Sequence, residues 1–364
     1  MKKETNNVSL RKIARHAGVS LTTTCVALQN QPGVSPATRG LILRSAKELG
    51  YVPDARIGSW MARVRDAKSK DLLPIAWLNT SQEKDAWQRY LFHTPYMEGA
   101  CERALELGYK LDEIWCREKG MTMRRLSGIL YHRGIEGVIV SFPAKHLRLD
   151  WDRLASVSIG ETLLGPRLHR IMSDVSFNFL LAMKSLRRLG YRRIGVCLAL
   201  DVDTASHYSV RSIARDLYFS ASKTERVPPL FHPPPWRKGC QDKDKRREMV
   251  AWLKRHKPEV IVGYNNHLVQ WVEAAGFRVP QDVGVVHLAV DDDVPDWAGI
   301  HSRRRKMGAT AVDWLVSLIR NRQFGVPETP LNILIRGTWQ IGRTLKTLPI
   351  AKPETATPVH GSPN

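Results

Sequence analysis

The sequence predicts an α/β protein with a small helical head at the N-terminus, followed by two doubly wound lobes with parallel sheets. Three short amphipathic stretches with capping residues precede residue 52. From Leu73 onward, apolar runs of strand length alternate with helical stretches. The chain of 364 residues is also long enough for two or three folding units. These observations together define the fold class.

The first two helices are predicted by their caps and their apolar spacing. In "VSLRKIARHAGVS", Ser9 is a natural N-cap and Gly18 ends the helix. The buried stripe of this helix is predicted to be Leu10, Ile13, Ala14 and Ala17. Ser20 caps a second short helix, whose predicted buried stripe is Leu21, Cys25 and Leu28. Two short helices joined by a turn with glycine form the helix-turn-helix arrangement.

A third helix and a linker complete the predicted head. Ser35 caps this helix, and Pro36 takes its first position, where no backbone N–H is needed. Its predicted stripe is Ile42, Ala46 and Leu49. The next segment, "YVPDARIGSWMARVR", can begin one more short helix at Pro53. We expect a head over residues 1–52, a hinge helix and linker over 53–71, a two-lobed domain over 72–348 and a disordered tail over 349–364.

The two-lobed domain is predicted by its alternating pattern. Apolar runs of strand length begin at Pro74, Glu136, Ile194, Glu259 and Val283. Helical stretches alternate with them near residues 94–108, 122–132, 175–189, 204–221, 243–256, 266–275 and 305–321. Such alternation is typical of parallel sheets covered on both faces. The number of these units suits two doubly wound lobes better than one.

The charge of the chain favours a polyanionic partner. It carries 56 Lys and Arg against 35 Asp and Glu, for a net charge of +21. Residues 1–70 contain 13 of the basic residues and only 4 of the acidic ones, a net charge of +9. The basic charge is therefore densest in the predicted helical head.

Several classes of protein are disfavoured by the sequence. The five cysteines show no Cys-x-x-Cys pair and no spacing with histidine that suits zinc, so we expect reduced thiols and no metal. The chain has no G-x-x-x-x-G-K-[ST] or G-x-G-x-x-G loop, so no cofactor is expected. It also lacks an apolar run long enough to span a membrane and the apolar core of a signal peptide. We therefore expect an intracellular protein without a membrane partner.

The motifs in combination resemble the lactose-repressor family of bacterial transcription regulators. The resemblance covers roughly residues 8–345 and rests on "VSLRKIARHAGVS", "VSPATRGLILRSAKELGYVPD", "LRRLGYRRIGV", "GFRVPQDVGVVHL" and "MGATAVDWLVSLI". It implies a homodimer whose second helix enters the major groove of an operator and whose hinge helix enters the minor groove. It also implies a two-lobed domain similar to a periplasmic sugar-binding protein, with an effector between the lobes.

The resemblance assigns DNA-binding roles to residues of the head and hinge. Leu21 and Thr22 fall at base-reading positions, while Ser20 and Thr23 are phosphate or turn contacts. Val26 stands where the family commonly has a guanine-reading arginine, so we expect a half-site richer in A·T there. Trp60 replaces a leucine that wedges into the central base step, although a core role for it is the alternative. The expected DNA-binding set is Ser9, Arg11, Ser20, Leu21, Thr22, Thr23, Val26, Asn30, Arg39, Arg56, Ile57 and Trp60.

The same resemblance suggests an effector site. Arg211 and Asn265 match cleft residues, but the usual cleft aspartate falls on Ala289, with three aspartates just beyond it. Either Asp291 supplies the missing acid or the ligand differs. The alternatives without a role in ligand binding are a surface salt bridge for Arg211, a core position for Trp77 and a solvated loop for residues 291–293. The expected effector-binding set is Trp77, Asn79, Arg211, Asn265 and Asp291.

These expectations converge on a dimeric, cytoplasmic, nucleoid-associated repressor of carbohydrate-use genes, controlled by a small-molecule effector such as a sugar. Two alternatives stay open. In the first, the lobe domain serves only to dimerise or to sense a protein or a non-sugar ligand. An enzyme with an accessory DNA-binding head is the other, although no nucleophile, acid–base pair or cofactor loop with supporting spacing is found.

Overall fold

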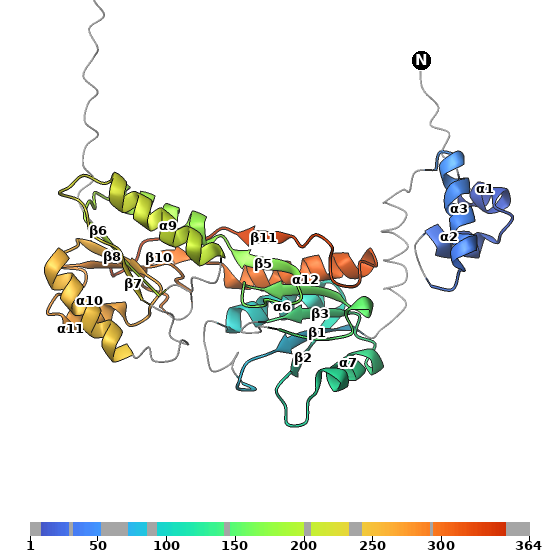
Figure 1. Cartoon of the computed structure of the whole chain (residues 1–364), viewed down its shortest axis with the longest axis horizontal. Coiled ribbons are helices and arrows are strands. Elements are labelled where there is room, and N and C mark those ends of the chain that lie inside the picture. The colour runs from blue at the N-terminus through green and yellow to red at the C-terminus, as the bar shows by residue number, and fades with distance from the viewer. Residues whose placement is uncertain are drawn as a thin grey trace, which may run out of the picture. The chain divides into compact units, whose positions relative to one another are not determined.

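The computed structural model describes residues 9–28, 32–51, 72–85, 93–141, 146–199, 205–232, 242–291 and 294–346. The chain divides into two units, Met1–Leu72 and Leu73–Asn364 (Figure 1). The predicted hinge helix and the predicted tail lie outside the described residues. Each unit is considered by itself.

Within its described residues, the N-terminal unit contains three helices, α1 (Leu10–His16), α2 (Leu21–Leu28) and α3 (Pro36–Glu48). Gly18, with φ of +64°, ends the first helix as predicted, because glycine adopts this left-handed backbone without strain. The centre of the unit is apolar and is formed by the fully or nearly buried residues Ile13, Ala17, Ala27, Ile42 and Ala46. The predicted stripes of the first and third helices are therefore confirmed.

The predicted stripe of α2 is wrong in part. The residues that α2 buries are Thr24 and Ala27, with Leu28 packed beside them, whereas Leu21 is 39% exposed. Thr24 can be buried because its hydroxyl donates to the Ser20 carbonyl oxygen at 3.0 Å. The buried face of α2 is therefore rotated away from the face that the apolar residues alone predict.

The described part of the second unit contains two sheets of six strands, one in each lobe. The lobe 1 sheet is parallel and has the order β11-β5-β4-β3-β1-β2. Its strands are β1 (Leu73–Asn79), β2 (Tyr109–Trp115), β3 (Gly137–Val140), β4 (Ala155–Ile159), β5 (His169–Ser173) and β11 (Asn332–Ile335). Helices α6 (Thr94–Glu106) and α12 (Arg304–Arg320) contribute to one core of this lobe, and α7 (Met123–His132) to the other.

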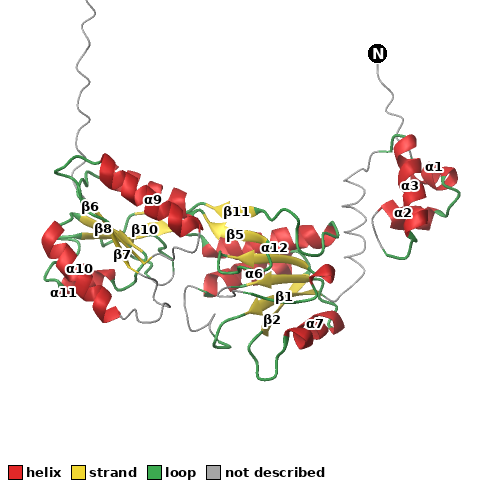
Figure 2. Ribbon diagram, in the orientation of Figure 1, coloured by secondary structure: helices red, strands yellow, loops and turns green. Residues whose placement is uncertain are grey.

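The lobe 2 sheet has the order β12-β10-β9-β8-β6-β7, and only its edge strand β12 is antiparallel. Its strands are β6 (Ile194–Ala199), β7 (Leu230–His232), β8 (Val260–Gly263), β9 (Gly284–His287), β10 (Ala298–His301) and β12 (Thr338–Gln340). Its helices are α8 (Val175–Arg188), α9 (Ala205–Ser220), α10 (Asp242–His256) and α11 (Leu268–Ala274). Figure 2 shows α9 on one side of these strands and α10 and α11 on the other.

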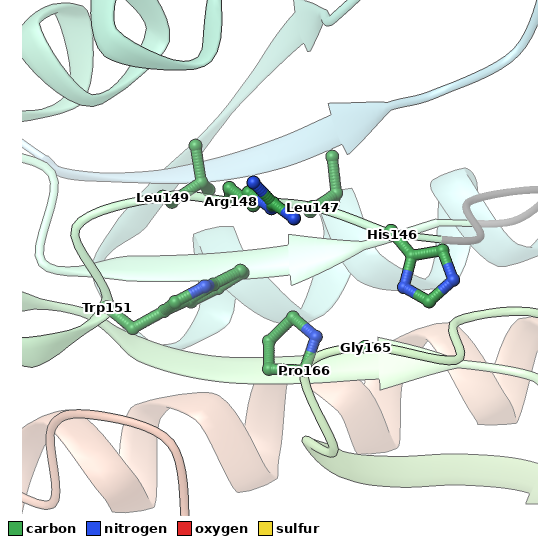
Figure 3. A pocket seen from close by; sticks show the side chains of 7 residues that line it. All are labelled: His146, Leu147, Arg148, Leu149, Trp151, Gly165 and Pro166. Atoms are coloured by element: carbon green, nitrogen blue, oxygen red, sulfur yellow. The ribbon is translucent and has the colours of Figure 1, made fainter.

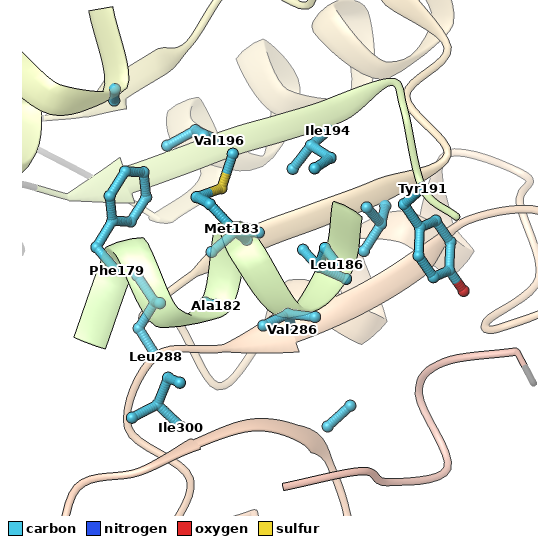
Figure 4. Close-up of a cluster of buried hydrophobic side chains, with 14 of the residues drawn as sticks. Phe179, Ala182, Met183, Leu186, Tyr191, Ile194, Val196, Val286, Leu288 and Ile300 are labelled. Atoms are coloured by element: carbon cyan, nitrogen blue, oxygen red, sulfur yellow. The ribbon is translucent and has the colours of Figure 1, made fainter. Parts of the chain in front are cut away.

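Successive residues of a strand enter different cores. Val196 packs with α8 and α9, whereas Cys197 packs with α10 and α11. Figure 4 shows the first of these cores, in which Phe179 and Leu186 of α8 lie against the sheet. Burial on both faces explains why the strands read as continuous apolar runs, and it confirms the predicted doubly wound architecture. The predicted helices agree with the observed ones to within a few residues.

The chain crosses between the lobes three times. It passes from β5 to α8, from β10 to α12 and from β11 to β12. The second crossing contains Arg303, a non-glycine residue with left-handed backbone (φ 60°, ψ 44°) directly before α12. The same crossing contains Ser302 and leads into Arg304, the first residue of α12.

Helices α6 and α12 approach each other closely inside lobe 1. A Cβ atom placed on Gly99 would lie 2.0 Å from the carbonyl oxygen of Arg305, and one on Gly308 would lie 1.9 Å from that of Tyr96. Only glycine permits this backbone contact. The two helices are therefore held against each other along their N-terminal halves.

Candidate nucleic-acid interface and interlobe site

The start of α2 is fixed by its own hydroxyl groups. The Ser20 hydroxyl accepts a hydrogen bond from the backbone N–H of Thr23 at 3.0 Å, and the two side-chain oxygens lie 2.7 Å apart. This is the N-cap arrangement that satisfies an otherwise unpaired helix N–H. Ser20 and Thr23 thus make the turn contacts that were one of their two predicted roles.

One face of α2 remains at the surface. Because a helix turns by about 100° per residue, Leu21, Thr22, Cys25 and Val26 fall within an arc of about 140° opposite the buried Thr24 and Ala27. Leu21 and Thr22 are exposed, and Cys25 and Val26 are partly exposed. This outward face offers a hydroxyl, a thiol and aliphatic groups. Sequence reasoning had placed Cys25 inside, and the burial of Thr24 is the reason that it lies outside.

The cationic side chains of the N-terminal unit take two different roles. Arg11, Lys12 and Arg15 are exposed on α1, as predicted for groups that meet phosphates. Arg39 is partly buried, and its guanidinium donates to the carbonyl oxygen of Ala27 at 3.0 Å. This bond ties α3 to the end of α2, so Arg39 also positions that helix.

Of the five other predicted DNA-binding residues, the structure describes Ser9. Ser9 caps α1, where its hydroxyl accepts from the N–H of Lys12 at 3.3 Å. The other four lie outside the described residues, and these are Asn30, Arg56, Ile57 and Trp60. Their roles remain predictions.

Two of the predicted effector residues, Trp77 and Asn79, make internal contacts in lobe 1. Trp77 is 4% exposed and packs in the core with α6 and α12, which is the predicted alternative for this residue. Asn79 is 3% exposed; its amide donates to the Lys84 carbonyl (2.8 Å) and to the Glu113 carboxylate (2.7 Å), and its oxygen accepts from the N–H of Ser81 (3.0 Å). Neither side chain is available to a ligand in this conformation.

Arg211 and Asn265 remain closer to the surface. The Arg211 guanidinium lies 5.1 Å from the centre of the Phe231 ring, and within the described residues its Nε has no hydrogen-bond partner. Asn265 accepts from the N–H of His267 at 2.8 Å in the turn before α11. Arg211 makes no ion pair within the part of the chain that the structure describes, so the predicted alternative of a surface salt bridge is not seen there.

The loop after β9 is held by a buried histidine. His287 is 2% exposed, with Nε2 lying 2.7 Å from the Tyr264 carbonyl oxygen and Nδ1 accepting from the N–H of Ala289 at 3.2 Å. A carbonyl can only accept, so Nε2 carries the proton and the ring is neutral. His287 thereby fixes the backbone at Ala289, where the family's aspartate is missing.

Asp291 is buried rather than solvated, so the predicted solvated loop is wrong for this residue. Its carboxylate forms an ion pair with the Arg304 guanidinium at 2.9 Å, and their side chains are only 4% and 10% exposed. The Ser302 hydroxyl donates to the same carboxylate. His301 Nδ1 is 3.5 Å from Asp291, but it accepts from the N–H of Arg303 and so does not donate to the carboxylate.

The N-terminal end of α6 completes this cluster on the lobe 1 side. The Arg304 guanidinium hydrogen-bonds to the Tyr96 side chain, and burial raises the pKa of Tyr96 to about 12. Burial and the nearby Arg304 charge lower the pKa of His93 to about 4. Tyr96 and His93 are therefore both neutral near pH 7. We call Asp291, Ser302, Arg304, Tyr96 and His93 the interlobe cluster.

Two surface pockets lie elsewhere on lobe 1. One has a volume of about 330 Å³ and is lined by His146, Leu147, Arg148, Leu149, Trp151, Gly165 and Pro166 (Figure 3). The other, of about 430 Å³, is lined by Arg125, Gly128, Ile129, His132 and Arg133. Neither contains a predicted effector residue. In the described part of the chain, no group of three or more His, Cys, Asp or Glu side chains is arranged to hold a metal ion.

No helix in the described ranges combines the length and the apolar composition needed to cross a bilayer.

Two family models match the chain. Residues 9–54 match the bacterial regulatory proteins of the lacI family, and residues 183–339 match a periplasmic binding protein-like domain. These matches correspond to the three-helix unit and to a stretch that covers lobe 2 and the return through α12.

Curated relatives are similar over most of their length. The HTH-type transcriptional repressor PurR of Haemophilus influenzae is 24% identical over 340 residues, which covers 88% of this chain and 94% of the relative. The HTH-type transcriptional regulator AglR of Rhizobium meliloti is 24% identical over 300 residues, which covers 79% of each. Both relatives are transcription regulators.

Solved structures share the fold. A complex of the transcriptional regulator CelR with cellobiose has a TM-score of 0.54 at 19% identity, covering 93% of this chain and all of the other. The lac repressor dimer bound to operator and the anti-inducer ONPF has a TM-score of 0.52 at 18% identity, covering 94% and 100%. The predicted two-part architecture is confirmed by these likenesses.

Proposed function

Because the chain belongs to the lacI family of bacterial regulatory proteins, we propose that it is a dimeric DNA-binding transcription regulator controlled by a small-molecule effector between its lobes. The observation that carries the DNA-binding part is the capped helix α2 with an outward face of Leu21, Thr22, Cys25 and Val26. Exposed cations of α1 stand in the same small unit. This arrangement suits a helix that reads base edges while neighbouring cations meet phosphates.

The outward face of α2 favours thymine-rich contacts. Aliphatic groups such as those of Leu21 and Val26 pack on thymine methyl groups, and the Thr22 hydroxyl can bond to several base edges. We propose base-reading roles for these three residues and a positioning role for Arg39. On this proposal, the protein acts on the nucleoid in the cytoplasm.

Selection of binding sites from random double-stranded DNA by the full-length protein tests this function. We expect enrichment of two half-sites related by two-fold symmetry, since a dimer presents two copies of α2. Recovery of unenriched DNA, with a folded protein at low salt, would contradict the proposal. A symmetric site with strong guanine preference opposite Val26 would leave the function standing and overturn the assigned reading.

We propose Arg211 as an effector contact, with carbohydrates as the first class to test. The support is its Nε, which is without a hydrogen-bond partner among the described residues, and the adjoining Phe231 ring. A carbohydrate is suggested by CelR in complex with cellobiose and by a lacI-family regulator of Enterococcus faecium with bound ribose, which has a TM-score of 0.52 at 14% identity and covers 76% of this chain and 100% of that one. A repressor of carbohydrate-use genes follows as the proposed role.

A thermal-shift screen of mono- and oligosaccharides tests the effector part. We expect a stabilising ligand whose effect is lost in Arg211→Ala and retained in Arg215→Ala, since Arg215 lies exposed one turn further along α9. Loss in both variants would point to general charge rather than to Arg211.

A second candidate keeps the DNA-binding head but has a lobe domain that responds to a protein or to a non-sugar ligand. It is favoured by one observation, the internal engagement of Trp77, Asn79 and Asp291. Silence across the saccharide panel, with intact operator binding, would support it. We propose no enzymatic role, because the interlobe cluster holds an ion pair and neutral groups rather than a nucleophile with its base.

A further inference from the structure

The interlobe cluster has the chemistry of an anion site that the protein fills with its own carboxylate. We propose that an effector bearing a carboxylate or phosphate group binds Arg304 in place of Asp291. This proposal rests on the proposed effector control and names the charge of the ligand. An uncharged sugar does not satisfy it.

Two donor groups meet one oxygen of the Asp291 carboxylate, Oδ2. The Arg304 guanidinium lies at 2.9 Å, and the Ser302 hydroxyl donates to the same oxygen. The Tyr96 side chain also accepts a hydrogen bond from the Arg304 guanidinium. The guanidinium is thus held in place by α6 while its charge faces a carboxylate. Such an oriented guanidinium recognises carboxylate and phosphate groups in preference to neutral ones.

The two members of the ion pair belong to different lobes. Asp291 follows β9 of lobe 2, where the preceding Val290 is anchored by its N–H to the Ile300 carbonyl oxygen at 2.7 Å. Arg304 is the first residue of α12, which packs in the core of lobe 1. Between them runs a crossing whose residue Arg303 has left-handed backbone. A change in the angle between the lobes at this crossing would separate the carboxylate from the guanidinium.

The burial of Arg304 favours another anion as the replacement for its partner. Arginine keeps its charge at all relevant pH values, so the guanidinium needs a counter-charge or water wherever it stays buried. When the lobes separate and Asp291 withdraws, the lobe 1 part of the cluster, Arg304 with Tyr96 and His93, offers a cation and two neutral polar groups. An anionic ligand there binds only the separated state, and so it shifts the population toward that state.

The affinity of the full-length protein for inorganic phosphate and for citrate, measured by titration calorimetry at constant ionic strength, tests this proposal. Glucose serves as the uncharged probe. In Asp291→Asn, the internal competitor loses its charge, so we expect at least one of the two anions to bind ten-fold or more tightly than in the wild type. In Arg304→Gln, we expect no anion binding, whereas Arg305→Gln should behave as the wild type.

Arg305 is the matched control because it is the next residue of the same helix but is 55% exposed and paired with Glu98 and Glu102. The double variant Asp291→Asn with Arg304→Gln removes both charges, and it should fold even where a single variant does not. It should not bind the anions. Circular dichroism of each variant reports whether it is folded.

Three results would overturn the proposal. Equal anion affinity in the wild type and in a folded Asp291→Asn would show that no competition takes place. Anion binding that survives in Arg304→Gln or in the double variant, or that is lost equally in Arg305→Gln, would place it elsewhere. Operator binding is measured in parallel for each variant. If the wild type did not bind operator DNA, the proposed function would be refuted. If operator binding were intact but no anion binding were detected, only this inference would be refuted.

Discussion

The side chains of the candidate DNA-binding face of α2 and those of the candidate effector site in the lobes differ in their exposure to solvent. On α2, Leu21 and Thr22 stay at the surface, and the hydroxyl bonds of Ser20 hold the helix behind them. In the lobes, Trp77, Asn79 and Asp291 are each less than 10% exposed and already have internal partners. If the proposed function holds, the contrast predicts a DNA-reading surface that is already formed, and an interlobe region where Trp77, Asn79 and Asp291 would have to lose their internal partners before they could contact a ligand.

The largest expected effect concerns the preformed surface and its cations. If Arg11, Lys12 and Arg15 of two subunits meet phosphates, operator affinity should fall roughly 10³-fold between about 50 and 200 mM salt, because binding releases counterions. Fluorescence anisotropy with a selected operator at several salt concentrations measures this slope. A nearly flat dependence would mean that the exposed cations of α1 do not contact DNA.

The next largest effect is expected from loss of the ion pair between Asp291 and Arg304. Asp291→Ala leaves the Arg304 charge buried without its carboxylate, and it should lower the free energy of unfolding by about 3 to 5 kcal/mol. Asp313→Ala is the control, since Asp313 pairs with Arg103 but is 38% exposed. This exposed pair should contribute about 0 to 1 kcal/mol. Chemical denaturation of both variants compares them, and equal losses would remove the distinction between the two pairs.

Exchange of one side chain on the outward face of α2 sharpens the comparison further. Val26→Arg should create a preference for guanine at the facing base pair, worth about 1 to 3 kcal/mol of discrimination. The stability of the protein should change little, because Val26 is only partly buried. Repeated selection from random DNA reports the preference. An unchanged base at every position of the half-site would refute the placement of Val26.

The smallest effect separates the cap from the reading face. Ser20→Ala removes the acceptor for the Thr23 N–H and should destabilise the protein by about 1 kcal/mol. Thr22→Ala should leave stability nearly unchanged and weaken operator binding instead. Thermal unfolding and anisotropy measured on both variants give the two readouts. The opposite assignment would result if Thr22→Ala lowered the melting temperature and Ser20→Ala did not.

Local signals predicted most of the secondary structure. Ser9 and Ser35 cap the helices that the sequence assigns to them, and the alternating pattern placed the helices of both lobes. These features depend on residues within one turn or one strand. The buried face of α2 was misassigned because Thr24 counts as polar in any pattern, although a bond to the Ser20 carbonyl oxygen satisfies its hydroxyl.

The interlobe cluster could not be predicted from such local sequence signals. Asp291 was singled out as a possible replacement for the missing acid at Ala289, but its partner Arg304 was not. The pairing depends on a crossing between two lobes and on α6, whose Tyr96 lies more than 200 residues away in the sequence. Asn79 was likewise assigned to a ligand, whereas the fold uses its amide to close a turn. Tertiary contacts decide which polar side chains remain available.

The glycine contact between α6 and α12 has a mechanical consequence. Because Gly99 and Gly308 have no side chains, the backbones of α6 and α12 are in direct contact. This contact, close to Arg304 and Tyr96, restricts sliding of one helix along the other. Both helices pack on the core that also holds Ile75 and Trp77 of β1. A displacement of Arg304 would therefore be expected to move α6 and α12 together. The strand β1, which packs on the same core, is the first element of the second unit in the sequence.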